Sequence, residues 1–230
     1  MNYGRRMESK RPIPFKLSDL VPNIDAWVEA SSRSDHLSFV PQPVDAAFPP
    51  FSVISSTTPG DRKAAKEKGF VSNGSKIFRT FFLSFHHFDD DIAKKVLQST
   101  LQTSDAFAIV ELQDRRILTL AFMLKEFWLL FLIGGLWFWN DTLQLMLIYA
   151  VPVLPVIHCF DGIVSCLRTR TSSEIMDLVN AVGGGEVDMT VSEGSGTKIR
   201  RGQWKFTHTR ALHTWPVCHM EVTIGLKDGA

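Results

Sequence analysis

Polar side chains that could carry chemistry follow several short apolar segments of this 230-residue chain. His86 and His87 follow one of them, and the carboxylates Asp19, Asp45 and Glu111 follow three others. Near neutral pH a histidine can accept a proton from a substrate, so His86 or His87 is a candidate general base. In an open α/β sheet, ligands bind at the carboxyl ends of the strands, where an acid after the second strand commonly binds a ribose diol. Asp19 fits that position, and a simple turn or helix-cap aspartate is the alternative.

We expect no metal site from the histidine, aspartate or cysteine side chains. The pair His86-His87 precedes the acids Asp89 to Asp91, but adjacent histidines on a strand point to opposite sides, and acids suit the positive end of a helix. The cysteines form no CxxC motif, so we expect neither structural zinc nor a disulfide framework, but free buried thiols. They are Cys159, Cys166 and Cys218.

Other histidines and arginines leave two interpretations open. His208 and His213, beside Trp215, are candidates to line the same pocket, and packing or surface roles are the alternative. Four arginines flank a long apolar segment, where they are typical of membrane flanks or solvated charges, and a phosphate-binding role, for example on a prenyl diphosphate, is the alternative. They are Arg115, Arg116, Arg168 and Arg170.

The elements that must position these residues alternate between strand and helix. Apolar runs and capping residues predict strands at 14–20, 37–40, 76–85 and 106–111, with helices at 23–34 and 92–103. Residues 46–75 are rich in Pro, Ser, Thr, Gly and Lys, which predicts a long surface loop. This alternation predicts a mostly parallel sheet covered by helices.

The last third of the chain has a different pattern. A helix is predicted at 173–181, ended by the glycines 183–185, and a loop at 182–202. Two strands at 203–208 and 218–225 predict an antiparallel hairpin at one edge of the sheet.

Residues 117–160 form an apolar segment with only three charged residues, Lys125, Glu126 and Asp141. Its two halves, 117–139 and 143–160, are long enough to cross a bilayer. Against spanning, Lys125 and Glu126 would each cost about 2.5 to 3.5 kcal/mol at the bilayer centre, and prolines interrupt the second half. Three alternatives remain open: a hairpin in the membrane interface, a spanning hairpin, and buried helices or a lipophilic substrate pocket.

Composition excludes several classes of protein. Charged residues make up 21% and hydrophobic residues 45% of the chain, which excludes a wholly disordered protein. The net charge of +1 makes nucleic-acid binding unexpected. The basic arm at residues 1–13 is followed by no apolar run, so no secretory signal is expected and we expect an intracellular protein.

Five sequence elements resemble the class I S-adenosylmethionine-dependent methyltransferases, and more closely a set of fungal methyltransferase-like proteins of secondary-metabolite pathways. The first two are SFHHFDD at 84–90 and ELQDRR at 111–116. The others are the apolar insertion at 117–160, DGIVSCLRTR at 161–170 and LHTWP at 212–216. The resemblance covers about residues 14 to 227.

The resemblance implies an α/β fold, an incomplete Rossmann-like methyltransferase sheet with an apolar helical insertion. The Rossmann-like part is expected at 14–116, the insertion at 117–160, and a helix with the closing strands at 161–230. The implied cofactor is S-adenosylmethionine, to be bound by Asp19, Asp45 and Phe85, with His86 or His87 as the base. The implied partners are a lipophilic small molecule and pathway enzymes, and the apolar segment at 117–160 indicates a membrane surface or bilayer as a further partner, such as the endoplasmic reticulum.

One departure from the family pattern affects the expected function. Such methyltransferases begin with a strand and a GxGxG turn, whereas only the basic arm precedes residue 14, and the glycines 183–185 follow a helix instead of opening one. Without that strand, which lies at the middle of the family's sheet, the sheet must have a gap or re-pair. Three hypotheses follow: a methyltransferase-like protein that is truncated or independent of its cofactor, a cofactor-free cyclase or isomerase, and a non-catalytic membrane-bound accessory protein.

Overall fold

The computed structural model describes residues 13–50, 53, 76–183, 187–193, 196–215 and 217–229, so the expected basic arm and most of the expected loop at 46–75 lie outside the described residues. The chain divides into two compact units. One contains Met1–Ile77 with Lys95–Asp105, and the other contains Phe78–Lys94 with Ala106–Ala230.

The first unit contains a small parallel strand pair. β1 (Phe15–Leu17) pairs with β2 (Leu37–Phe39), and α1 (Ile24–Ser32) connects them. The side chain of Asn23 accepts a hydrogen bond from the backbone N–H of Ala26 and so caps α1. This strand–helix–strand order confirms the sequence prediction, although both strands are shorter than expected.

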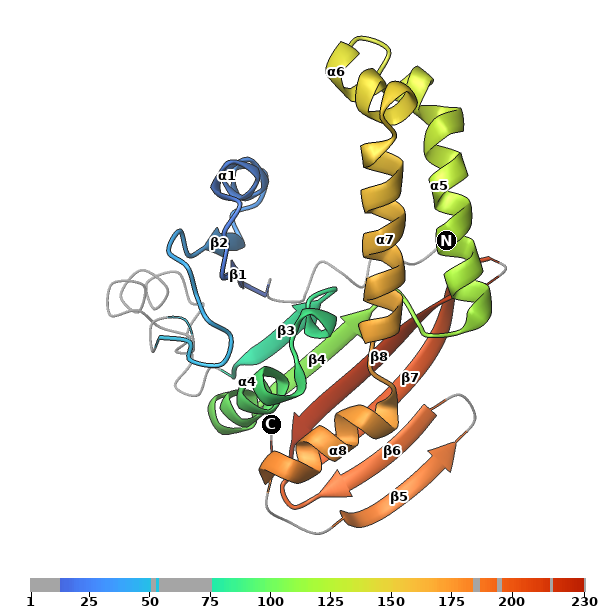
Figure 1. Ribbon diagram of the computed structural model, residues 1–230. Helices are drawn as coiled ribbons and strands as arrows, with labels where there is room; N and C mark the ends of the chain where they lie inside the picture. The colour runs from blue at the N-terminus through green and yellow to red at the C-terminus, as the bar shows by residue number, and fades with distance from the viewer. Residues whose placement is uncertain are drawn as a thin grey trace, which may run out of the picture. The chain divides into compact units, whose positions relative to one another are not determined.

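The second unit is built on a six-stranded sheet with the order β3-β4-β8-β7-β6-β5 (Figure 1). Its strands are β3 (Phe78–Phe82), β4 (Ala106–Glu111), β5 (Val187–Glu193), β6 (Gly196–Arg201), β7 (Trp204–Thr214) and β8 (Cys218–Lys227). Between β3 and β4 the chain forms α4 (Asp90–Thr103), where the sequence predicts a helix at 92–103. The first residues of α4 belong to this unit. The fold is therefore mixed α/β.

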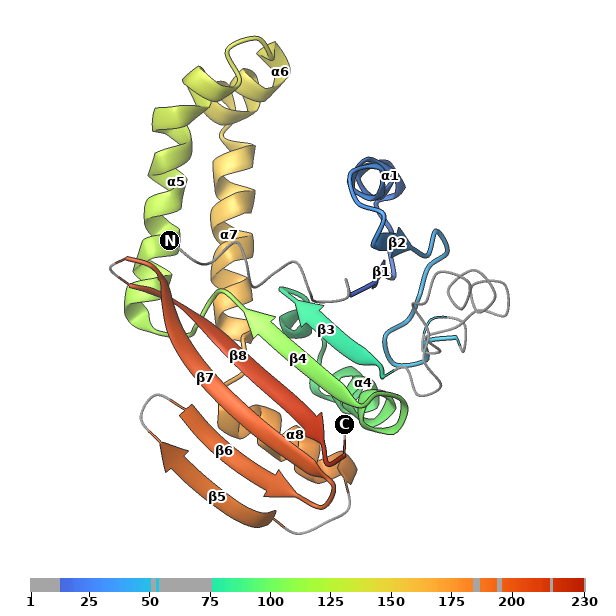
Figure 2. The ribbon, with the colours of Figure 1, turned by 180° about the vertical axis from the view of Figure 1, so that it is seen from behind.

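The expectation of a mostly parallel sheet is wrong. In the six-stranded sheet only β3 and β4 pair in parallel, and every other neighbouring pair is antiparallel. The expected loop at 182–202 instead forms the strands β5 and β6 (Figure 2). The segments that connect β5 to β6 and β6 to β7 are short, and such short connections join only antiparallel strands. The predicted β7–β8 hairpin exists, but it lies inside the sheet, because β8 pairs with β4 and β7 pairs with β6.

The helix α8 (Ser172–Gly183) lies over one face of this sheet (Figures 1 and 2). Phe107 packs against Trp204 and Phe206, and all three are buried. A Cβ on Gly225 would lie only 2.2 Å from the Phe107 ring, so this position has room only for glycine. The carboxyl end of β4 carries the polar residues described below.

A helical hairpin extends from the sheet, as the sequence predicts. α5 (Ile117–Trp137) and α7 (Val153–Arg168) lie side by side and antiparallel, joined by α6 (Thr142–Leu145) and the π-helix η3 (Met146–Ala150) (Figures 1 and 2). α7 runs eight residues beyond the predicted end at Phe160. The chain bends by 72° between Ala150 and Val153, at Pro152. By length and composition, α5 is one helix apolar enough to cross a membrane.

Candidate functional site

The candidate site begins at the turn after β3. Leu83 has a φ of +49°, which is uncommon for a residue other than glycine, and its N–H donates to the carbonyl of Val110 on β4. This turn leads into the short 3₁₀-helix η2 (Phe85–His87), where the sequence predicted a strand continuing to Phe85. The two predicted histidines therefore lie on a turn anchored to the end of β4.

Glu111, the last residue of β4, holds His86 by two hydrogen bonds. The His86 Nδ1 lies 2.7 Å from the Glu111 Oε2, and the His86 backbone N–H donates to the Glu111 Oε1 over 3.1 Å. Both side chains are about 95% buried. Because an ionised carboxylate only accepts hydrogen bonds, the proton of the imidazole belongs on Nδ1, which leaves Nε2 as the basic nitrogen.

His87 is exposed, and its ring centroid lies 4.2 Å from that of His86. The sequence analysis expected adjacent histidines to point to opposite sides of a strand, but the 3₁₀ geometry brings the rings together instead. His87 is thus the ring that a ligand can reach, with the buried His86–Glu111 pair next to it. This arrangement presents an exposed imidazole, which can exchange a proton with a ligand, beside a fixed neighbouring ring.

Two arginines at the end of α7 bind the other side of this turn. Arg168 donates to the carbonyls of His86 (2.7 Å) and His87 (2.9 Å). Arg170 donates to the carbonyls of Phe85 and Phe88 and to the carboxylate of Asp90. The hydrogen bond and the charge of Arg170 hold the pKa of Asp90 below its usual value. These arginines therefore fix the turn to the helical hairpin.

A cleft of about 650 Å³ lies beside this turn, and its polar wall contains four basic and four acidic residues. Arg115 and Glu174 form an ion pair of 2.7 Å within it. Because acids offset the arginines, the wall does not favour a phosphate group over other polar ligands. The lining residues are Phe88, Asp89, Asp90, Lys94, Arg115, Arg168, Arg170, Glu174, Asp177 and Leu178.

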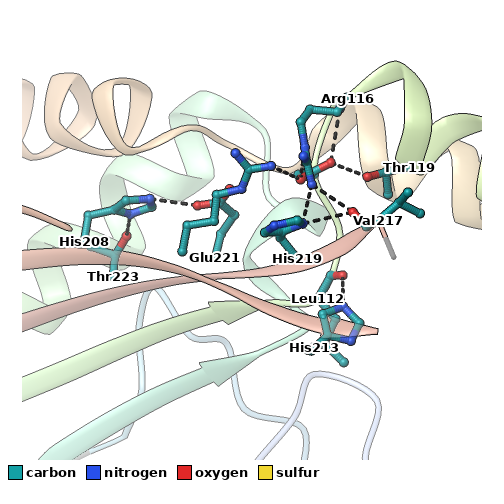
Figure 3. A network of polar contacts seen from close by, with 11 residues as sticks. Leu112, Arg116, Thr119, His208, His213, Val217, His219, Glu221 and Thr223 are labelled. Atoms are coloured by element: carbon teal, nitrogen blue, oxygen red, sulfur yellow. Dashed lines mark hydrogen bonds and ion pairs between the residues drawn. The ribbon is translucent and has the colours of Figure 1, made fainter. Parts of the chain in front are cut away.

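A second polar network lies where the sheet meets the base of α5 (Figure 3). Its centre is the buried carboxylate of Asp114, which accepts hydrogen bonds from Thr119, Arg116 and Arg210. Burial raises the pKa of Asp114, but the hydrogen bonds from Thr119 and Arg116 and the charge of Arg116 outweigh it. The pKa therefore lies below its ordinary value of 3.8. Arg116 also reaches the carbonyl of Val217 and the ring of His219.

The same network contains a second histidine–glutamate pair (Figure 3). His208 on β7 contacts Glu221 on β8 over 2.8 Å and Thr223 over 2.9 Å. Glu221 lies directly opposite Glu111 in the β4–β8 register, so two acid–imidazole pairs occupy neighbouring strands. His213, the other candidate, is exposed and lies 2.9 Å from the carbonyl of Leu112. The roles of Glu221 and Asp114 were not predicted from the sequence, because strand pairing brings His208 to Glu221 and chain folding brings Arg210 to Asp114.

The residues assigned to the cofactor are divided between the two compact units. The carboxylate of Asp19 accepts the N–H of Val21, and that of Asp45 accepts the N–H of Ala47, as turn aspartates do, and both belong to the first unit. Phe85 is 1% exposed in the core of the second unit, in edge contact with other phenylalanine rings. Val44, next to Asp45, donates its N–H to the carbonyl of Asp19 over 2.8 Å, so the first unit brings the two aspartates close together.

Metal and cysteine chemistry add no further site. Within the described ranges, no group of three or more His, Cys, Asp or Glu side chains is placed to hold a metal ion. The three cysteines are buried and free, and burial raises the pKa of Cys166 to about 11. No protein-family model, curated protein or solved structure matches this chain.

The buried pair yields a stability prediction. Glu111→Gln leaves the two donors of His86 facing an amide that has only one accepting oxygen, so the free energy of unfolding should fall by about 1 to 3 kcal/mol. Asp91→Asn is the matched control, because Asp91 is exposed in the same unit and its pair with Lys94 is 3.6 Å long. Urea unfolding measures both variants, and equal losses would contradict a structural role for the pair.

The lowered pKa of Asp114 yields a pH prediction. Because this pKa is lower in the folded chain, ionised Asp114 stabilises the fold above pH 3.8, and that contribution disappears as the pH falls further. The difference in unfolding free energy between the unsubstituted chain and the Asp114→Asn variant should be constant from neutral pH to about pH 4 and shrink below it. Urea titrations at a series of pH values test this, and a difference independent of pH would refute it.

Proposed function

We propose that this chain is a methyltransferase-like protein of fungal secondary-metabolite biosynthesis that carries out acid–base chemistry on a lipophilic small molecule at an intracellular membrane. The observation that carries the proposal is the exposed ring of His87 beside the buried His86–Glu111 pair. This pair lies at the carboxyl ends of β3 and β4, the two parallel strands of the larger sheet. Ligands of α/β folds bind at that end.

The strand order supports the methyltransferase-like part of the proposal. β1 and β2 form a sheet of their own, and β3 lies at one edge of the six-stranded sheet. This is the division expected when the middle strand of the family's sheet is not present. In the six-stranded sheet β8 runs antiparallel to both of its neighbours, β4 and β7.

The cofactor-free form of the function is favoured over methyl transfer. The side-chain oxygens of Asp19 and Asp45 accept backbone N–H groups of their own turns, and Phe85 is a core residue. His86, His87 and Glu111, by contrast, form a compact acid–base group. Proton transfer by His87, with His86 and Glu111 as positioning residues, suits an isomerisation or cyclisation. If the cofactor binds, it supplies the methyl group, and His87 would take the proton from the accepting atom.

A position at a membrane would explain why the proposed substrate is lipophilic. Arg168 connects α7 of the apolar hairpin directly to the carbonyls of His86 and His87. A lipophilic molecule that leaves the bilayer along the hairpin would therefore arrive at the histidine turn. Enzymes of the same pathway are the expected protein partners.

Mass spectrometry of reaction products tests the proposed function. Purified full-length chain is incubated with a lipophilic extract of the organism that encodes it, with and without S-adenosylmethionine. The proposal predicts conversion of a compound to an isomer of equal mass without the cofactor. His87→Ala should reduce the rate at least about a hundredfold, in line with the contribution of a general base, whereas His213→Ala should leave it unchanged.

The other outcomes separate the alternatives. A product heavier by one methylene group, formed only with the cofactor, would overturn the cofactor-free form and establish methyl transfer. No conversion under either condition would contradict catalysis and favour a membrane-bound accessory protein. Unchanged conversion by the His87→Ala variant would remove His87 from the mechanism.

A further inference from the structure

We infer that the distal half of the helical hairpin, residues 127–157, inserts into one leaflet of a phospholipid bilayer without crossing it. This inference deepens the membrane part of the proposed function, and the geometry of the hairpin carries it independently of the chemistry proposed for His87. Large apolar side chains of this half face outward, among them Leu136, at 80% exposure, and Trp137, at 77%. The only acidic or basic side chain within residues 127–157 is Asp141, whose Oδ1 caps Gln144 in α6.

A belt of ionisable side chains borders this apolar half. Lys125 and Glu126 lie on α5, and His158 and Asp161 lie on α7. The two helices are antiparallel (Figure 1), and a Cβ on Gly162 would lie 3.0 Å from the sulfur of Met123, so residues 123 and 162 are at the same height along the hairpin. Because Lys125, Glu126, His158 and Asp161 lie within four residues of this pair, the four ionisable residues are at a similar level.

The side chain of Lys125 indicates which side of the belt faces water. Its Nζ lies 4.0 Å from the centre of the Phe122 ring, one turn closer to the sheet. The ammonium group is thus directed away from the apolar half and toward the sheet. A lysine near the surface of a bilayer directs its charge to the polar side in this way.

The length of the apolar half matches one leaflet. From Phe127 to Trp137, α5 has 11 residues, which rise about 16 Å, roughly half of the 30 Å hydrocarbon core. The 72° bend then turns α6 and η3 across the tip, so the second helix does not continue outward (Figures 1 and 2). At the tip the Tyr149 hydroxyl donates to the carbonyl of Phe131, which satisfies a polar group that lipid could not.

The positions of the charged residues favour insertion into one leaflet over a hairpin that crosses the whole bilayer. A crossing hairpin would place Lys125, Glu126 and Asp161 in the hydrocarbon, and each charge costs about 2.5 to 3.5 kcal/mol at the bilayer centre. Insertion up to the belt places only Asp141 there. Insertion into one leaflet is therefore favoured, because it places one charged residue in the hydrocarbon instead of three.

Protection of a thiol at the tip tests the depth of insertion. The full-length Asn140→Cys variant is added to preformed vesicles of phosphatidylcholine and phosphatidylserine, and a membrane-impermeant maleimide is supplied outside or trapped inside. Asn140 is exposed, and the three native cysteines are buried. We expect labelling without vesicles, and at least tenfold slower labelling with vesicles from either side. The Gly202→Cys variant, on the exposed β6–β7 turn, should react equally with and without vesicles.

Each other result overturns the inference. Labelling from the vesicle interior would show that the hairpin crosses the bilayer. Equal external labelling with and without vesicles would show that the tip stays in water. Protection in the absence of vesicles would show that a second copy of the chain covers the tip.

Vesicle flotation provides an independent test. Leu136→Glu places a charge in the inserted half and should weaken vesicle binding about a hundredfold. Leu167→Glu introduces the same change at a residue of 53% exposure on the other side of the belt and should change binding less than threefold. Equal effects of the two substitutions would contradict insertion of the distal half.

Discussion

The candidate site and the hairpin both depend on the carboxylate of Glu111. It ends β4 and accepts both the ring N–H and the backbone N–H of His86, so it binds the turn after β3 at the core of the sheet. Because Glu111 holds the turn from the β4 side, the backbone carbonyls of the turn can accept hydrogen bonds from Arg168 and Arg170 at the end of α7. A buried carboxylate is costly unless its hydrogen bonds are made, so this end of the sheet tolerates little rearrangement.

The pairing of β4 with β8 further limits rearrangement at this end of the sheet. Glu111 and Glu221 lie opposite each other in the register, where like charges destabilise a sheet. Each carboxylate is paired with a histidine, His86 or His208, and Arg210 lies 3.3 Å from Glu221. Arg210 and Arg116 also bind Asp114 at the base of α5. The contacts of Arg210 and Arg116 therefore link the closing strands to the base of the hairpin, and the strand register places the His86–Glu111 pair beside them.

Local patterns in the sequence predict much of this fold. The apolar run at 106–111 became β4 with the same bounds, Asn23 caps α1, and the long apolar segment forms an antiparallel helical hairpin. The strands β5 and β6 were missed, because polar residues dominate them and glycines flank them, a composition typical of loops. Strand direction was also wrong, since parallel or antiparallel pairing depends on contacts between distant segments.

The site was predictable only in part. The residue types identified His86, His87 and Glu111 at strand ends, but a 3₁₀ turn, which the sequence did not predict, brings the two rings together. Arg116 and Thr119 bind Asp114 from nearby in the sequence. The other hydrogen-bond partners of the Glu221, Asp114 and Arg168 side chains lie between 13 and 96 residues away, where no local pattern indicates them. Phe85 was expected at a cofactor, but it packs among phenylalanine rings in the core.

Nitrogen NMR of the histidine side chains tests the central interaction most directly. In full-length chain labelled with ¹⁵N-histidine, the account predicts that the His86 Nδ1 carries a proton that exchanges slowly with water at neutral pH. In the Glu111→Gln variant this proton should exchange rapidly. A His86 ring protonated only on Nε2, or an Nδ1 proton whose exchange is unchanged in the variant, would contradict the account.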